Sequence, residues 1–135
     1  MNTFKLEIVT PQATVFSEPV EMVTLPTADG QIGVYAEHVP LITQLVPGEL
    51  IVVQQGRERL LAVGEGLVEV GGAHMSIVTD MAIPAENIDE AKIEEARARA
   101  ARRLQEKISD EEVASVNASM VRALAQLQVR RRLRR

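Results

Sequence analysis

The 135-residue sequence contains no cysteine and no tryptophan. The absence of cysteine excludes a disulfide framework, a thiolate metal site and a cysteine nucleophile together. Aromatic side chains are limited to Phe4, Phe16 and Tyr35, so no run of aromatic residues is available on which nucleic-acid bases could stack. Aliphatic packing, charge and turn chemistry must therefore account for the fold and the function.

Long apolar runs are also absent from the sequence. No stretch approaches the roughly 20 apolar residues of a membrane-spanning helix, and the N-terminal sequence MNTFKLEIV carries Lys5 and Glu7 inside its apolar segment, unlike a signal peptide. We therefore expect a soluble protein of the cytoplasm without direct membrane insertion. A globule of this length buries roughly two-thirds of its surface, so neither a metal nor a disulfide is required for stability. We also expect no required cofactor.

Glycine and proline disappear from the sequence after Pro84, and the sign of the charge changes at the same place. Residues 1–86 contain 11 acidic and 3 basic side chains, a net charge of −8, whereas residues 87–135 contain 8 acidic and 12 basic side chains, a net charge of +4. Such an asymmetry predicts two domains, 1–86 and 87–135, that attract one another or face different partners.

The first domain alternates apolar and polar residues with the period of two that half-buried strands show. Turn signals recur about every 8 to 12 residues, and roughly eight to ten short strands fit between them. Among these turns are Asp29-Gly30, Pro47-Gly48 and Gly71-Gly72. The pattern is typical of an antiparallel sandwich or barrel, and we expect an N-terminal antiparallel β-sandwich.

The second domain has the periodicity of two helices. Asn87 is a candidate N-cap for a first helix that runs to about Lys107, and Ser109 with Glu112 forms a capping box for a second helix. The short connection predicts an antiparallel α-helical hairpin, so the fold class is α+β. The apolar stripe of the first helix is Ile93, Ala96, Ala100 and Leu104, and that of the second is Val113, Val116, Met120, Leu124 and Leu127.

The most specific stretch is residues 29–50, DGQIGVYAEHVPLITQLVPGEL. It resembles the epsilon subunit of the bacterial and chloroplast rotary ATP synthases, in which this stretch usually reads DGxxGxxxxHxPxxTxxxPGxL. Residues 64–70, GEGLVEV, continue the likeness, although two adjacent glycines are more usual there in that family. The resemblance covers nearly the whole chain.

The resemblance implies a non-catalytic subunit of the central stalk of a proton-translocating ATP synthase, at the cytoplasmic face of the inner membrane. The sandwich would bind the gamma subunit and rest on the c-subunit ring, coupling rotation to ATP synthesis. The helical hairpin would restrain ATP hydrolysis by contact with the catalytic beta subunit. A small nucleotide-sensing module and a nucleic-acid-binding protein are the alternatives.

The segment from Ile88 to Lys92, IDEAK, is similar to the I/L-D-x-x-R-A segment by which some epsilon subunits bind ATP. The resemblance implies that regulatory ATP is held by Ile88, Asp89, Lys92, Arg99 and Arg122. Lys92 stands where that segment has arginine, and it keeps the charge without the bidentate geometry for phosphate.

A structural interpretation of the same residues is simpler. In it Asp89 complements the helix dipole and Arg99 pairs with Glu95 on the exposed side of the first helix. Both interpretations stay open at the level of the sequence.

The basic end of the chain is the second candidate site. By the resemblance, the residues that contact the catalytic subunit and inhibit it are Arg122, Arg130, Arg131 and Arg132, with Arg134 and Arg135 beyond them. A nucleic-acid partner is disfavoured, since the chain as a whole is acidic and poor in aromatic residues.

No group of residues predicts catalysis or metal binding. Glu37, His38 and His74 lack a nucleophile motif or a carboxylate cluster beside them. The glycines never form the GxxxxGK[ST] pattern of a P-loop. The sequence therefore predicts a subunit that is not itself an enzyme.

Overall fold

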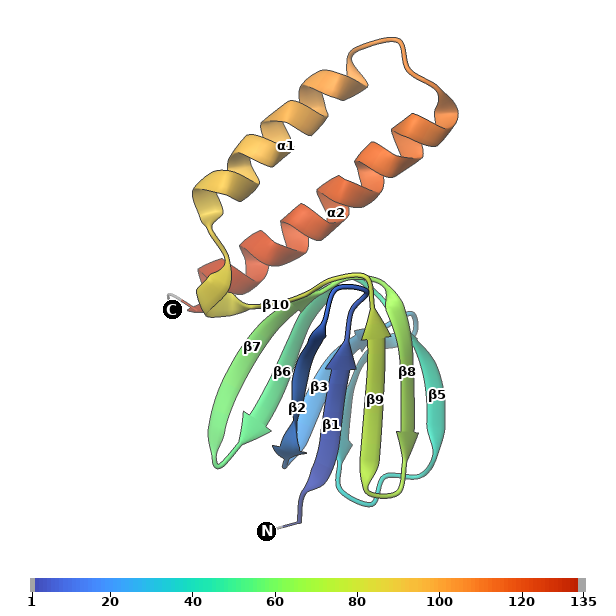
Figure 1. The fold of residues 1–135 in the computed structure, drawn as a ribbon, viewed down its shortest axis with the longest axis vertical. Coiled ribbons are helices and arrows are strands. Elements are labelled where there is room, and N and C mark those ends of the chain that lie inside the picture. The colour runs from blue at the N-terminus through green and yellow to red at the C-terminus, as the bar shows by residue number, and fades with distance from the viewer. Residues whose placement is uncertain (1, 134–135) are drawn as a thin grey trace.

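The computed structural model describes residues 2–133, which form ten strands, a 3₁₀ turn and two α-helices (Figure 1). The predicted fold class, an N-terminal β-sandwich followed by an α-helical hairpin, is confirmed. The strands are β1 (Phe4–Val9), β2 (Thr14–Val20), β3 (Met22–Thr27), β4 (Gly30–Tyr35), β5 (Leu41–Leu45), β6 (Gly48–Gln54), β7 (Arg57–Val63), β8 (Gly66–Gly71), β9 (His74–Thr79) and β10 (Ala82–Pro84).

The strands follow the order β10-β7-β6-β3-β5-β8-β9-β1-β2, with β4 beside β3. Within the described residues β3 and β5 are joined by the single pair Thr27–Leu45, and the sheet folds over there into two layers. Strands β1 and β9 run parallel, whereas the other pairs are antiparallel. Since β1 and β9 come from opposite ends of the domain, no tight turn forces an antiparallel direction on them.

The turn of the β3–β4 hairpin begins one residue earlier than the Asp29-Gly30 signal in the sequence indicates. Its turn residues are Ala28 and Asp29, and Gly30 already opens β4 with a φ of 112°. The Thr27 hydroxyl donates to the Gly30 carbonyl at 2.5 Å and accepts the Asp29 N–H at 3.3 Å. Gly30 is required here because other residues rarely adopt such a φ.

The helices begin after η1 (Ala85–Asn87) and are α1 (Glu90–Leu104) and α2 (Asp110–Leu133). The predicted cap Asn87 is wrong: the N-cap is Asp89, whose carboxylate accepts the N–H groups of Ala91 at 3.0 Å and Lys92 at 3.3 Å. Asn87 cannot cap α1 because the extended and buried Ile88 lies between Asn87 and the start of the helix.

The predicted second cap is confirmed, and the first helix is shorter than expected. The Ser109 hydroxyl accepts the Glu112 N–H at 3.1 Å at the start of α2. Helix α1 ends at Leu104 rather than near Lys107. The Glu112 side chain pairs with Arg103 of α1 and so links the two helices across their connection.

Helix α2 lies between α1 and the sandwich (Figure 1). Met120 and Ala123 face α1, where they lie beside Ala96 and Ala100. Val129, on another side of α2, packs with Ala62, Met81, Ala85 and Ile88 in a small apolar cluster at the sandwich edge. The predicted single apolar stripe is therefore incomplete.

Leu124 is the residue of that stripe that the structure contradicts, because its side chain is 42% exposed. It lies between the side of α2 that faces α1 and the side that faces the sandwich. A helix covered on two sides needs two separate apolar strips, and small residues such as Ala125 and Val129 supply the second.

We predict that the fragment 1–86 folds alone. The main core is made only of sandwich residues, and the helices cover a separate small cluster. Circular dichroism should show a cooperative thermal transition, lowered by roughly 4–8 °C for each kcal/mol of lost helix packing. A fragment that extends to Asp89 and keeps Ile88 is the control, and a broad, non-cooperative transition in both fragments would contradict an independent sandwich.

Candidate functional site

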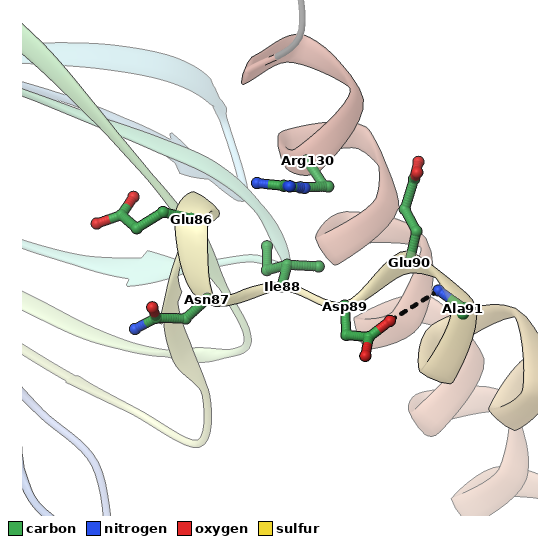
Figure 2. Close-up of a pocket in the computed structure, with 7 residues that line it drawn as sticks. All are labelled: Glu86, Asn87, Ile88, Asp89, Glu90, Ala91 and Arg130. Carbon is green, nitrogen blue, oxygen red and sulfur yellow. Dashed lines mark hydrogen bonds between the residues drawn. The ribbon is translucent and has the colours of Figure 1, made fainter.

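An open pocket of about 390 Å³ lies where the sandwich meets the hairpin (Figure 2). It is lined by the linker and the first turn of α1, with one side chain from α2: Glu86, Asn87, Ile88, Asp89, Glu90, Ala91 and Arg130. Figure 2 shows Arg130 reaching from α2 across Ile88 toward the linker. Three carboxylates and a single guanidinium make the lining predominantly acidic.

The residues predicted to hold ATP do not line one pocket in this arrangement of the chain. Ile88 and Asp89 belong to the pocket of Figure 2, but Lys92, Arg99 and Arg122 do not. Lys92 and Arg99 are exposed on α1. ATP binding therefore stays a prediction.

The structural interpretation of these residues is partly seen. Asp89 lies at the N-terminus of α1 as this interpretation expects, and its carboxylate accepts the Ala91 N–H at 3.0 Å. The ion pairs of the described residues do not include the expected pair of Arg99 with Glu95.

The four arginines predicted to contact the catalytic subunit are all held by groups of this chain. Arg131, on α2, pairs with Glu90 at 3.2 Å and Glu94 at 3.1 Å on α1. The other three reach toward the sandwich side: Arg122 lies 3.7 Å from Asp80, Arg130 donates to the Ala85 carbonyl at 3.4 Å, and Arg132 pairs with Glu49 at 2.6 Å. Arg134 and Arg135 lie outside the described residues.

Glu49 is the most enclosed carboxylate among these pairs, with a side chain only 17% exposed. Burial raises the pKa of the Glu49 carboxyl; the nearby Arg132 opposes this rise and Glu58 adds to it. Because burial is the largest cause, the charged form is costly at this place despite the pairing with Arg132.

Asp80 reaches α2 because Gly64 has no side chain. A Cβ at Gly64 would lie 1.9 Å from the Asp80 carboxylate oxygen, so no other residue fits there without moving it. The Asp80 N–H also donates to the Glu65 carbonyl at 3.1 Å. Sequence reasoning missed Asp80 and Glu49. Asp80 stands in no motif, Glu49 occupies a variable position of the 29–50 pattern, and only the net charge of −8 pointed to acidic partners.

A third feature is an apolar patch on the outer face of β5, β8 and β9. Ile42, Leu67 and Val78 are 68%, 54% and 55% exposed. Leu67 and Val78 are direct cross-strand partners, and Ile42 is paired with Glu69 on the neighbouring strand. The sequence already contained a signal for this patch. Each of the three residues is aliphatic at a position where the alternation of a half-buried strand calls for a polar residue.

Within residues 2–133, no helix is long and apolar enough to cross a membrane. No group of three or more potential metal ligands lies together in that range.

Comparison with known proteins gives one consistent result. Residues 3–85 match the family model of the β-sandwich domain of the ATP synthase delta/epsilon chain. An ATP synthase epsilon chain of Herpetosiphon aurantiacus is 39% identical over 93% of this chain and 92% of its own length. One of Alkalilimnicola ehrlichii is 36% identical over 100% of this chain and 97% of its own length.

A solved structure agrees with these sequence matches. A chain in the mitochondrial ATP synthase of Euglena gracilis, solved with its F1 part and c-ring, superposes with a TM-score of 0.68 at 25% identity. The match covers 98% of this chain and 79% of the Euglena chain. The family model matches more than half of the chain, and both relatives exceed 30% identity over at least 93% of it, so the chain belongs to the epsilon-chain family of ATP synthase.

Proposed function

We propose that this chain is the central-stalk subunit that couples rotation to ATP synthesis and restrains ATP hydrolysis through its helices. Family membership supports the place in the complex. The observation that carries the regulatory part is the pairing of Arg122, Arg131 and Arg132 with carboxylates of the same chain. In this docked form the arginines are occupied. Arg122 and Arg132 become available to another acidic surface when α2 leaves the sandwich, whereas Arg131 becomes available when α2 separates from α1.

The sandwich is the coupling part of this proposal. Exposed aliphatic residues grouped on one face of a sheet are typical of an interaction surface. We assign the patch of Ile42, Leu67 and Val78 to the gamma subunit and place the sandwich against the c-subunit ring. The chain then lies at the cytoplasmic face of the inner membrane as a peripheral part of the complex.

The hairpin is the regulatory part. Its docking on the sandwich combines a small apolar cluster with the ion pairs of Arg122 and Arg132. An exposed ion pair such as Arg122 with Asp80 contributes about 0–1 kcal/mol. Two arrangements that differ by a few kcal/mol can both be populated, and a partner that binds only one of them shifts the balance. We propose that the acidic segment of the catalytic beta subunit is that partner.

The gamma-binding face can be tested by placing a charge in the patch. Leu67→Asp should weaken binding to the gamma subunit by about tenfold or more, because an interface would bury a carboxylate without a partner. Arg57→Asp, in the β6–β7 hairpin, is the matched control and should bind as the parent does. Equal affinities of the two variants, measured by calorimetry, would place gamma on another face.

The inhibitory role of α2 predicts that removing it increases hydrolysis. ATP hydrolysis by the assembled complex should be faster with a chain that ends at Lys107 than with the full chain. The difference should shrink as salt rises, because the Debye length falls from about 30 Å at 0.01 M to about 3 Å at 1 M. Equal rates at low salt would show that α2 is not the inhibitory arm.

Regulatory ATP rests on the resemblance, and calorimetry with millimolar ATP tests it. ATP held by Asp89 and Arg122 would require both helices close together and so favour the docked form. Arg122→Ala should then weaken binding by about 10- to 150-fold, since a charge-assisted hydrogen bond contributes roughly 1.5–3 kcal/mol. Arg57→Ala is the control, and absence of heat from the parent chain would remove ATP from the proposal.

A further inference from the structure

The apolar part of the contact between α2 and the sandwich fixes the position of the helix along its axis only weakly. Val129 packs with Ala62 and Ala85, whose side chains are small, and with the larger Met81 and Ile88. A shift of α2 by one turn, about 5.4 Å, would bring Ala125 to the place of Val129. An aliphatic residue would again face this cluster, although alanine fills less space than valine. The apolar packing therefore favours the observed register without excluding a shifted one.

Two ion pairs lie near the ends of the same contact. Arg122 Nη1 is 3.7 Å from Asp80 Oδ2, and Arg132 Nη1 is 2.6 Å from Glu49 Oε1. The ten positions between the two arginines correspond to about 15 Å of helix. The two carboxylates come from different places in the sandwich, Glu49 from β6 and Asp80 from the segment between β9 and β10.

A shift of α2 by one turn in either direction would move Arg122 away from Asp80 and bring no other cation to its place. The residues three and four positions from Arg122 are uncharged: Ala118, Ser119, Ala125 and Gln126. The residues at those distances before Arg132, Gln128 and Val129, are uncharged as well. Glu49 is largely shielded from water, so an unpaired carboxylate there is especially unfavourable.

The remaining polar contacts of α2 select its register less strongly. Gln126 donates to the Met81 sulfur at 3.3 Å and Arg130 to a backbone carbonyl at 3.4 Å. A thioether is a weak acceptor, and backbone carbonyls recur along the chain. The carboxylate of Asp80, in contrast, occupies the space that Gly64 leaves open.

We infer that Glu49 and Asp80 set the single register in which α2 docks on the sandwich, by pairing with Arg132 and Arg122. In this register both arginines are occupied or released together. The regulatory meaning of that coupling rests on the proposed function. The register itself is a property of the isolated chain. Its test is therefore separate from any test on the assembled ATP synthase.

The absence of cysteine allows two spin labels to be attached at chosen places in the full chain. Ser17→Cys on β2 and Ser115→Cys on α2 are both at exposed positions, and pulsed EPR then measures the distance between the labels. The labelled parent should give one narrow distance. Adding Glu49→Gln and Asp80→Asn should reduce that population and produce another, displaced by up to about 5.4 Å, one helical turn.

Two controls separate register from general loosening. Glu94→Gln removes a partner of Arg131 between α1 and α2 and should leave the distance unchanged. Exchanging the charges, with Asp80→Arg and Arg122→Asp together, should restore the narrow distance that Asp80→Arg alone broadens. An unchanged single distance in the Glu49→Gln, Asp80→Asn chain, with an unchanged thermal transition, would overturn the inference.

Discussion

The arrangement of the second domain depends on the contact between one side of α2 and the edge of the sandwich. Helix α1 has no buried residue and packs on α2 through alanines such as Ala96 and Ala100. Its own contact with the cluster at the sandwich edge is made by the partly buried Ile93, so its position depends mainly on α2. Each buried methylene contributes about 0.8 kcal/mol, so a cluster in which α2 contributes Val129 supplies limited free energy to docking.

The opposite net charges of the two domains act through particular pairs rather than as a uniform attraction. Exposed pairs such as Arg131 with Glu90 add little stability and weaken with salt. Glu49 differs, because burial already raises its pKa and the pairing with Arg132 offsets only part of that cost. Such a pair adds little to the stability of the docked form. It disfavours positions of α2 in which Glu49 has no cation beside it, and selecting one register in this way is the best-attested use of buried charge in proteins.

Local patterns in the sequence predicted the sandwich, the hairpin and the family, whereas features that depend on distant partners were missed. The period of two in residues such as Phe4, Leu6 and Ile8 follows directly from strand geometry, and all three are in the core. The exposure of Leu124 could not be predicted, because helical periodicity does not reveal that α2 is covered on two sides. Arg132 was predicted as a site residue, but its partner Glu49 is 83 positions away and occupies a variable position of the 29–50 pattern.

The proposed inhibition and the docking of α2 exclude each other for a chemical reason. Arg122 and Arg132 cannot pair with Asp80 and Glu49 and at the same time with an acidic surface of another subunit. By linkage, whatever tightens the docked form must weaken the inhibitory contact by the same factor, and the reverse also holds. If inhibition works as proposed, the carboxylates of the sandwich would act on the catalytic subunit without touching it, because they would compete with it for the same guanidinium groups.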